Sequence, residues 1–382
     1  MGERVLVTGG AGFVGSHLVD ELLARGHAPV VLDSLEPQVH GAGAEKADFR
    51  PEYLHPDAEL IRGDVMDRSV LDGALDGVDA ILHHAAAVGV GQSMYEIDRY
   101  VARNTQATAV LLQALVDRRE QHPIRRLVVA SSMSIYGEGE YRLADGSSFS
   151  PRTRPDEQLA ARQWEMLGPD GAVAEPIPTT EDKPLHPTSV YALSKRDQEE
   201  YCLLVGAAYD IPTVALRYFN IYGPRQALSN PYTGVAAIFG SCLLNGSAPI
   251  VYEDGLQSRD FVHVRDIVQA NMRALEADAE HVAGAVLNVG TGRSTNLLQL
   301  WEALQKALDV TGVEPTIPGR FRTGDIRHCY SDISRAAATI GYQPTVELES
   351  GLAELADWMR TQEAENLTAR AAAELERKGL VR

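Results

Sequence analysis

The sequence is poor in cysteine and lacks long apolar runs. Its 382 residues include three cysteines, Cys202, Cys242 and Cys329, which lie far apart with no Cys-x-x-Cys spacing. This argues against a disulfide framework or a zinc site, so no metal is expected, and it favours reduced thiols in a cytoplasmic protein. No apolar run approaches the ~18 residues that a membrane span requires.

Basic residues are also scarce relative to acidic ones. The chain has 35 Lys and Arg against 53 Asp and Glu, a formal net charge of −18. This balance argues against a nucleic acid or an anionic membrane as a partner, since both attract basic surfaces. An anionic small ligand stays possible, because a few arginines and backbone N–H groups can outweigh the overall field. The chain enters a strand pattern at once, which predicts no signal peptide.

Short apolar runs alternate with helical patterns through the first half of the chain. The runs are apolar throughout, as in strands buried on both faces of a parallel sheet. They span residues 5–7, 30–32, 80–82, 127–130 and 214–216. Helical spacing of apolar residues covers 13–25, 68–75, 95–119 and 190–209. This alternation predicts an α/β fold, a Rossmann-like doubly wound parallel sheet with a smaller C-terminal substrate-binding lobe.

Two segments interrupt this rhythm. Residues 139–186 are rich in Pro, Gly, Arg and Glu, with a short helical pattern near 157–166, and residues 223–255 are rich in turn residues. We expect a Rossmann domain over 1–220 that contains the insertion 139–186 and is completed by 259–290. The expected substrate lobe comprises 221–258 and 291–362. The charged, Ala-rich tail, 363–382, is predicted to be a solvated surface helix.

A glycine turn follows the first predicted strand and opens the first predicted helix. Its spacing is Gly-x-x-Gly-x-x-Gly, on Gly9, Gly12 and Gly15. The first glycine permits a tight turn, the second lets the backbone approach a pyrophosphate, and the third lets helix pack on strand. The N–H groups at the helix start, around Phe13 and Val14, then face the phosphates. The turn predicts a dinucleotide site.

Asp33 ends the second predicted strand. A carboxylate there can accept hydrogen bonds from both adenosine ribose hydroxyls and would repel a 2′-phosphate. Ser34 follows, and no arginine is near to hold that phosphate, which favours NAD over NADP. A helix cap or a turn is the alternative role for Asp33. Asp64 and Val65 follow the next strand and are placed to contact the adenine, unless they belong to a plain turn.

Tyr191 and Lys195 stand four residues apart, on one face of a predicted helix. A phenol with its ordinary pKa of about 10 is a poor base at neutral pH. A neighbouring ammonium and an oxidised nicotinamide both favour the phenolate, which can then remove a hydroxyl proton as hydride leaves. Ser131 and Ser132 end a strand at the sheet edge where such folds bind ligands, and Ser132 can bond the same hydroxyl. Alone, the Tyr-x-x-x-Lys spacing also suits an exposed amphipathic helix.

Taken together, these features resemble the extended short-chain dehydrogenases, the family of NAD-dependent nucleotide-sugar epimerases and dehydratases. The resemblance is carried, in the family's order, by residues 8–15, Asp33, Asp64, residues 83–86, Asn104, Ser132, Tyr191, Lys195 and residues 217–220. It runs from about residue 4 to about residue 358 and is interrupted by the insertion.

This resemblance implies NAD as cofactor and a nucleotide-diphosphate sugar as substrate. The implied cofactor-binding residues are Gly9, Gly12, Phe13, Val14, Gly15, Asp33, Asp64, Val65, Ala85, Ala86, Asn104, Ser131, Tyr191, Lys195 and Tyr218. The implied substrate-binding residues are Val88, Ser132, Ser134, Asn220, Arg259, Arg322 and Arg327. Asn220 would contact the pyrophosphate and the arginines would clamp it, a task that suits bidentate guanidinium groups. Ordinary surface salt bridges are the alternative for each arginine.

The resemblance also implies a homodimer. The predicted helices over 95–119 and 190–209 are similar to those that pair across a two-fold axis in this family as a four-helix bundle. Two helices that merely cover the sheet are the alternative.

The residues after Ser132 separate the reaction classes of the family. The 4,6-dehydratases resemble one another in an Asp-Glu pair there, mannose dehydratases and glucuronate decarboxylases usually keep the Glu, and 3,5-epimerases carry a Cys nearby. Here Met133 and Ser134 follow, and neither can move a proton from carbon at neutral pH. We therefore predict catalysis by Ser132, Tyr191 and Lys195 of NAD-dependent epimerisation at C4, through transient oxidation to a 4-keto sugar.

Finer features leave alternatives open. Residues 131–137, residues 223–232 and the insertion look most like 4-epimerases of dTDP-6-deoxyhexoses such as dTDP-L-rhamnose. A 4-keto-sugar reductase or dehydrogenase, a dehydratase or decarboxylase, and a non-catalytic NAD sensor are the competing interpretations. A sensor would need no base. The insertion is either a surface excursion or a lid or subunit contact, and its candidate contacts are Arg142, Arg152, Arg154, Arg162 and Trp164.

Overall fold

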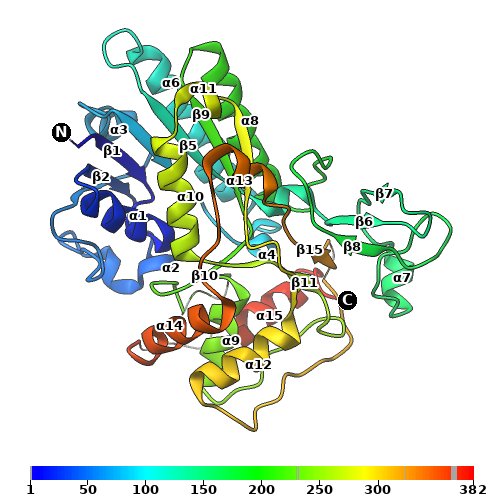
Figure 1. Ribbon diagram of the computed structural model, residues 1–382. Helices are drawn as coiled ribbons and strands as arrows, with labels where there is room; N and C mark the ends of the chain where they lie inside the picture. Colours follow the sequence, from blue (N-terminus) through cyan, green and yellow to red (C-terminus); the bar gives the residue numbers. More distant parts are fainter. Residues whose placement is uncertain (1, 229, 231, 323, 363–367) are drawn as a thin grey trace.

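A seven-stranded parallel sheet organises the first three quarters of the chain (Figure 1). This computed structural model describes residues 2–228, 230, 232–322, 324–362 and 368–382. The strand order is β3-β2-β1-β4-β5-β9-β13. The strands are β1 (Arg4–Thr8), β2 (Ala28–Asp33), β3 (Glu59–Arg62), β4 (Ala80–His83), β5 (Arg126–Ser132), β9 (Thr213–Tyr218) and β13 (Ala285–Val289). The predicted doubly wound α/β fold is confirmed.

Helices cover both faces of this sheet. One face packs on α1 (Phe13–Ala24), α10 (Val264–Glu276) and α13 (Ser334–Ile340), and the other on α3 (Arg68–Ala74), α6 (Ala107–Arg118) and α8 (Val190–Ala208). The predicted helices at 13–25, 68–75 and 190–209 agree with these bounds to within one residue. The one predicted over 95–119 is divided into α5 (Ile97–Tyr100), a π-helical segment η2 (Val101–Gln106) and α6. Strand order reverses between β1 and β4, which places a ligand site at their carboxyl ends.

The insertion folds as a small unit of its own, to the right in Figure 1. It contains an antiparallel sheet, order β7-β6-β8, and one short helix. Their bounds are β6 (Glu140–Arg142), β7 (Ser148–Phe149), α7 (Asp156–Ala160) and β8 (Glu175–Ile177). The helix predicted over 157–166 is shorter than expected, because Arg162 adopts a left-handed φ of 57° that ends the helical path.

The C-terminal lobe is built from short strands and three packed helices. The strands are β10 (Asn220–Tyr222), β11 (Ser258–Arg259), β12 (Phe261–His263), β14 (Thr295–Asn296) and β15 (His328–Cys329). The helices are α9 (Val235–Leu244), α12 (Leu297–Leu308) and α14 (Leu348–Arg360), and Phe239 meets Trp301 in their core. Residues 223–255 are rich in turn residues, yet the helix α9 forms within them. This apolar helix gains its stability from burial between α12 and α14.

Short helices complete the described part of the chain. They are α2 (Pro37–His40), η1 (Ala42–Glu45), α4 (Val90–Ser93), η3 (Met133–Tyr136) and α11 (Ala279–Val282). None of the helices in the described ranges combines the length and hydropathy that a bilayer crossing requires. The same ranges contain no cluster of three His, Cys, Asp or Glu side chains suited to a metal ion.

The tail does not form the solvated helix that its composition predicts. Helix α15 (Thr368–Arg377) is followed by a turn and a β-bridge from Val381 to Arg322, and Leu375 and Val381 are buried. Residues 363–367 of the predicted tail lie outside the described residues, as do Ser229, Pro231 and Thr323 of segments discussed above. The apolar side chains of Leu375 and Val381 therefore pack against the rest of the molecule.

Candidate active site

A cavity of about 880 Å³ lies at the carboxyl ends of the parallel strands and extends to the C-terminal lobe. Its lining includes nearly all of the predicted site residues. These are Gly9, Gly12, Phe13, Val14, Gly15, Asp33, Asp64, Val65, Ala85, Ala86, Val88, Ser131, Ser132, Ser134, Tyr191, Lys195, Tyr218, Asn220, Arg259 and Arg322. Two predicted residues, Asn104 and Arg327, do not line it. The topology therefore brings together residues separated by more than three hundred positions.

The glycine turn shapes one end of the cavity. Gly9 has a φ of 69°, and a Cβ on it would lie 2.9 Å from the Ala85 nitrogen. A Cβ on Gly15 would lie 2.3 Å from the Gly9 oxygen, whereas one on Gly12 would meet only that oxygen, at 3.3 Å. Helix α1 starts at Gly12 with no side-chain cap and no acidic residue in its first turn. The free N–H groups there suit a pyrophosphate that approaches the bare backbone.

Asp33 lies beside this turn at the end of β2. Its carboxylate accepts hydrogen bonds from the backbone N–H groups of Ala11 (3.0 Å) and Leu35 (2.8 Å). Burial raises the pKa of Asp33, while these bonds and the nearby His40 act in the opposite direction. Asp64 is farther along the same wall, where its carboxylate pairs with Arg103. The turn and Asp33 thus fit the pyrophosphate and the adenosine ribose of a dinucleotide.

Asn104, predicted as a cofactor contact, is fully buried and is not part of the cavity lining. Its amide oxygen accepts from the Ala87 nitrogen (2.7 Å), and its amide nitrogen donates to the Ala87 oxygen (3.0 Å) and to Ser194 Oγ (2.9 Å). All of these contacts are internal. Asn104 therefore joins the loop after β4 to α8, and the wider turn of the π-helix η2 carries it.

Ser132 and Tyr191 meet on the cavity wall. Burial raises the pKa of Tyr191, and the nearby Ser132 hydroxyl acts in the opposite direction. Ser134 Oγ donates to Ser132 Oγ (2.9 Å). Lys195 lies on the same face of α8, and burial lowers its pKa to about 8. Its Nζ donates to Gln198 Oε1 (2.8 Å).

Two supporting residues escaped the sequence reasoning. Glu199, one turn beyond Lys195 on α8, accepts from Ser131 Oγ (2.6 Å) and from Arg217 (2.5 and 3.0 Å). This buried contact ties α8 to the ends of β5 and β9. The i, i+4 spacing from Lys195 was the available signal. Tyr100 packs edge-on against the Tyr191 ring, 6.3 Å between centroids, and its spacing carried no signal.

The opposite end of the cavity carries the predicted substrate groups. Asn220 Oδ1 is buried and has no hydrogen-bond partner. Arg259 lines the wall and donates to the backbone oxygens of Ile326 (2.8 Å) and Arg327 (3.1 Å). Arg322 donates to Asp325 (2.7 Å) and lies over the Tyr252 ring, 5.0 Å from its centroid. This end therefore offers guanidinium groups and a vacant amide acceptor to a polar ligand.

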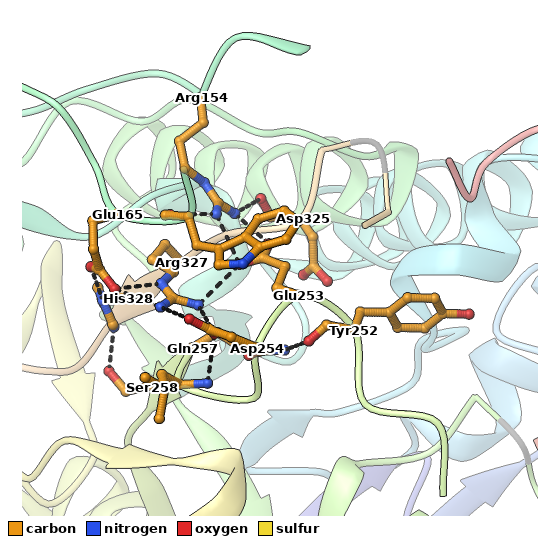
Figure 2. A network of polar contacts seen from close by, with 12 residues as sticks. Arg154, Glu165, Tyr252, Glu253, Asp254, Gln257, Ser258, Asp325, Arg327 and His328 are labelled. Atoms are coloured by element: carbon orange, nitrogen blue, oxygen red, sulfur yellow. Dashed lines mark hydrogen bonds and ion pairs between the residues drawn. The ribbon is translucent and has the colours of Figure 1, made fainter. Parts of the chain in front are cut away.

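Arg327, the other arginine predicted to clamp the phosphates, is not part of the cavity lining. The side chain is fully buried, and Figure 2 shows it surrounded by carboxylates. It donates to Glu165 (2.5 Å), Glu253 (3.1 Å) and Asp254 (2.6 Å). With its donors engaged, the guanidinium has no group left for a ligand.

The same cluster of ion pairs attaches the insertion to the C-terminal lobe. Arg154, whose side chain is 1% exposed, donates to both oxygens of Glu253 (2.9 and 2.8 Å) and to the Asp325 backbone oxygen (3.1 Å). Glu165 of the insertion binds Arg327 from the other side (Figure 2). None of the described insertion residues lines the cavity, so the idea of a lid over the pocket is not supported. The insertion instead supports the lobe segment that carries Arg322 and Asp325.

Comparison with known proteins identifies the family. Residues 5–160 and 165–290 match the model of the NAD dependent epimerase/dehydratase family. The chain belongs to this family. The resemblance seen in the sequence is thereby confirmed, and the protein is an NAD-dependent enzyme of the nucleotide-sugar 4-epimerase type.

Individual members of the family are similar over nearly the whole chain. A dTDP-L-rhamnose 4-epimerase of Burkholderia thailandensis is 36% identical over 361 residues, which cover 94% of this chain and 95% of that protein. A UDP-glucose 4-epimerase of Thermotoga maritima, solved with UDP-glucose, is 28% identical with a TM-score of 0.73 and coverage of 94% and 98%. One from Thermus thermophilus, solved with NAD, is 28% identical with a TM-score of 0.71 and coverage of 94% and 100%.

Proposed function

We propose that this family member inverts the configuration at C4 of a dTDP-6-deoxyhexose, with dTDP-L-rhamnose as the favoured substrate. The observation that carries the proposal is that Ser132, Tyr191 and Lys195 line one cavity, while Met133 and Ser134 are the residues that follow Ser132 there. Neither of the latter can move a carbon-bound proton, so chemistry beyond C4 oxidation and reduction lacks its acid and base. The 36% identity to a dTDP-L-rhamnose 4-epimerase supports the choice of sugar and base.

NAD held by the glycine turn and Asp33 would supply a reversible hydride acceptor for C4 of the sugar. The Tyr191 phenolate takes the proton of the C4 hydroxyl, while Ser132 hydrogen-bonds the same oxygen. The Lys195 ammonium favours the phenolate by its charge. Asn220, Arg259 and Arg322 hold the pyrophosphate while the keto sugar turns over, and Tyr191 then returns the proton.

The test is direct. The purified protein is denatured and its released nucleotide identified, and a panel of dTDP-, UDP- and GDP-sugars is then followed by NMR for inversion. We expect bound NAD and the conversion of dTDP-L-rhamnose to its C4 epimer without added cofactor. Stoichiometric consumption of reduced or oxidised cofactor would instead identify a reductase or a dehydrogenase. Loss of water or CO₂ from the sugar would identify a dehydratase or a decarboxylase, and binding of NAD without turnover of any sugar would favour a sensor.

Lys195→Met tests the electrostatic role of the ammonium. Removing the positive charge makes the Tyr191 phenolate less stable, so we expect the activity to fall and the acidic limb of the kcat/KM profile to move to higher pH. Some NAD affinity should also be lost. Lys195→Arg keeps a positive charge, so its acidic limb should lie at a lower pH than that of Lys195→Met. An unchanged pH profile in Lys195→Met would contradict the role.

Asp33 should decide between the two dinucleotides. A 2′-phosphate placed against its buried carboxylate would be repelled, so we expect NAD to bind at least about a hundredfold more tightly than NADP. Asp33→Asn should weaken NAD binding and reduce the ratio of the affinity for NAD to the affinity for NADP. Equilibrium dialysis against both dinucleotides measures it. Equal binding of NAD and NADP by the unaltered protein would show that Asp33 does not face the ribose.

We also propose a homodimer formed through α5, η2, α6 and α8. These helices expose Ile97 (53%), Val101 (44%), Leu193 (50%) and Leu204 (67%), an apolar face that a second copy of the same face would cover in a four-helix bundle. Leu204→Glu should give a monomeric mass by light scattering at micromolar concentration. Leu244→Glu, at an exposed leucine of α9 in the lobe, is the matched control. A monomeric unaltered protein would overturn the proposal.

The organisation and location expected from the sequence are proposed as well. Residues 1–220 and 259–290 would act as the NAD-binding domain, and 221–258 with 291–362 as the substrate lobe, because the glycine turn and Asp33 lie in the first group and Arg322 lies in the second. Cytoplasmic location is supported by the buried Cys202 and Cys329, which carry reduced thiols.

A further inference from the structure

The tail of the chain, residues 372–382, lies against the cavity. Ala372, Leu375 and Leu380 are part of the cavity lining. Leu375 is 8% exposed, and its Cδ2 lies 3.2 Å from the position of a Cβ on Gly91 in α4. In Figure 1 the helix α15 stands between the lobe helices and the C-terminus beside β15. The tail therefore forms part of the wall around the ligand site.

Surface contacts hold the tail to three parts of the molecule. Lys378 Nζ lies 5.4 Å from the ring centroid of Tyr95, near α4. Phe321 and Arg382 exchange backbone hydrogen bonds of 3.0 and 2.9 Å on the lobe. The Arg382 guanidinium pairs with Asp156 of the insertion. Exposed ion pairs of this kind are individually weak, whereas the buried side chains of Leu375 and Val381 pack against the rest of the molecule.

The cavity wall beside the tail is apolar. Val88, Val90 and Met94 line the cavity and are 46%, 50% and 38% exposed, which is unusual for large apolar side chains unless a ligand or partner covers them. Together with Leu375 and Leu380 they offer carbon atoms to the ligand. Arg322, which forms a β-bridge with Val381 of the tail, adds a guanidinium group to this wall.

This apolar part lies next to the reacting end. The Tyr100 hydroxyl donates to the Val88 backbone oxygen (3.0 Å), and the Tyr100 ring packs against that of Tyr191. A ligand group held by Val88 is thus near the sugar carbon that Tyr191 serves.

We propose that residues 372–382 are an outer wall of the sugar pocket, and that Leu375 and Leu380, with Val88, Val90 and Met94, select a ligand that carries a methyl group there. The proposal rests on the proposed function, in which a 6-deoxy sugar supplies that methyl group. A hydroxymethyl sugar would bury a hydroxyl among side chains that cannot bond it, whereas a methyl group gains from burial. A thymine base also carries a methyl group, and the substrates below separate the two sources.

Leu375→Ser is the main test, with Arg377→Ala as the matched control, because Arg377 is on the same helix with its side chain 68% exposed. The substrates are dTDP-L-rhamnose, UDP-L-rhamnose and a dTDP-hexose with a hydroxymethyl group. For Leu375→Ser we expect KM to rise about tenfold for both 6-deoxy sugars. The preference of the enzyme for these sugars over the hydroxymethyl sugar should therefore become smaller. The control should keep the KM values of the unaltered enzyme. A loss confined to the two dTDP-sugars would assign the wall to thymine and overturn the sugar assignment, and unchanged KM and preference would overturn the wall itself.

A chain ending at Gln362 lacks the outer wall and tests its role by a second measurement, the accumulation of reduced cofactor. If the 4-keto sugar escapes, each lost molecule leaves one hydride on the cofactor and releases one proton, so reduced cofactor accumulates one for one with keto sugar. We expect this accumulation, seen by near-ultraviolet absorbance, in the truncated chain and not in the unaltered enzyme; its absence in a folded truncated chain would overturn the proposal. If the truncated chain does not fold, Leu375→Ser decides alone. If the unaltered enzyme turns over a different nucleotide sugar, the proposed substrate is wrong, and the wall is judged on the KM of that sugar.

Discussion

Replacing Tyr191 with Phe is expected to lower kcat by about 10³-fold while NAD stays bound and the fold is kept. Only the hydroxyl is lost. The ring keeps its edge-on contact with Tyr100, and Ser132 keeps its hydrogen bond with Ser134. The proton of the C4 hydroxyl then has no acceptor at the wall, so hydride transfer stops although both ligands bind.

The measurement combines turnover by NMR with the nucleotide content of the denatured protein. Tyr201→Phe is the matched control, because Tyr201 belongs to the same helix α8 and is 40% exposed away from the cavity lining. It should keep full activity. Retention of more than a few per cent of activity in Tyr191→Phe would remove this phenol from the mechanism.

Arg154→Ala is expected to cost about 3–5 kcal/mol of the free energy of unfolding. The change leaves Glu253, whose side chain is 2% exposed, without its bidentate partner. It also removes the positive charge beside Glu138, a carboxylate whose pKa burial already raises and Arg154 lowers. An isolated buried carboxylate is costly because water no longer solvates it.

Urea denaturation measures this loss against Arg142→Ala, whose guanidinium is 51% exposed and pairs with an exposed Glu175 in the same insertion. The control should stay within about 0.5 kcal/mol of the unaltered protein. The deficit of Arg154→Ala should shrink as the pH falls, because an unpaired carboxylate can then bind a proton. Equal stability of the two variants would mean that the ion cluster does not hold the insertion to the lobe. Exchanging residues 139–175 for a Gly-Ser link removes Arg154 and Glu165 together, so its kinetics would report this instability as well.

The strands, the main helices and the dinucleotide end of the cavity were predictable because their signals are local. A buried strand needs a short apolar run, and the turn between β1 and α1 needs glycine at Gly9 and Gly15, where a Cβ would collide with backbone atoms. Tyr191 and Lys195 share a helical face through spacing alone. Each of these features is determined by residues a few positions apart.

The remaining features depended on contacts between distant segments, which only the tertiary structure decided. An arginine is the same residue in the sequence whether it meets a phosphate or a carboxylate; Arg327 lies among Glu165, Glu253 and Asp254, and Arg259 reaches the cavity. Asn104 turned inward on a π-helix that no pattern indicated. The tail has the composition of a solvated helix, yet Leu375 meets Gly91, which lies 284 positions (375 − 91) earlier in the chain. Composition and periodicity tell which side chains are apolar or charged, but the partner that each of them meets is determined by the folding of the whole chain.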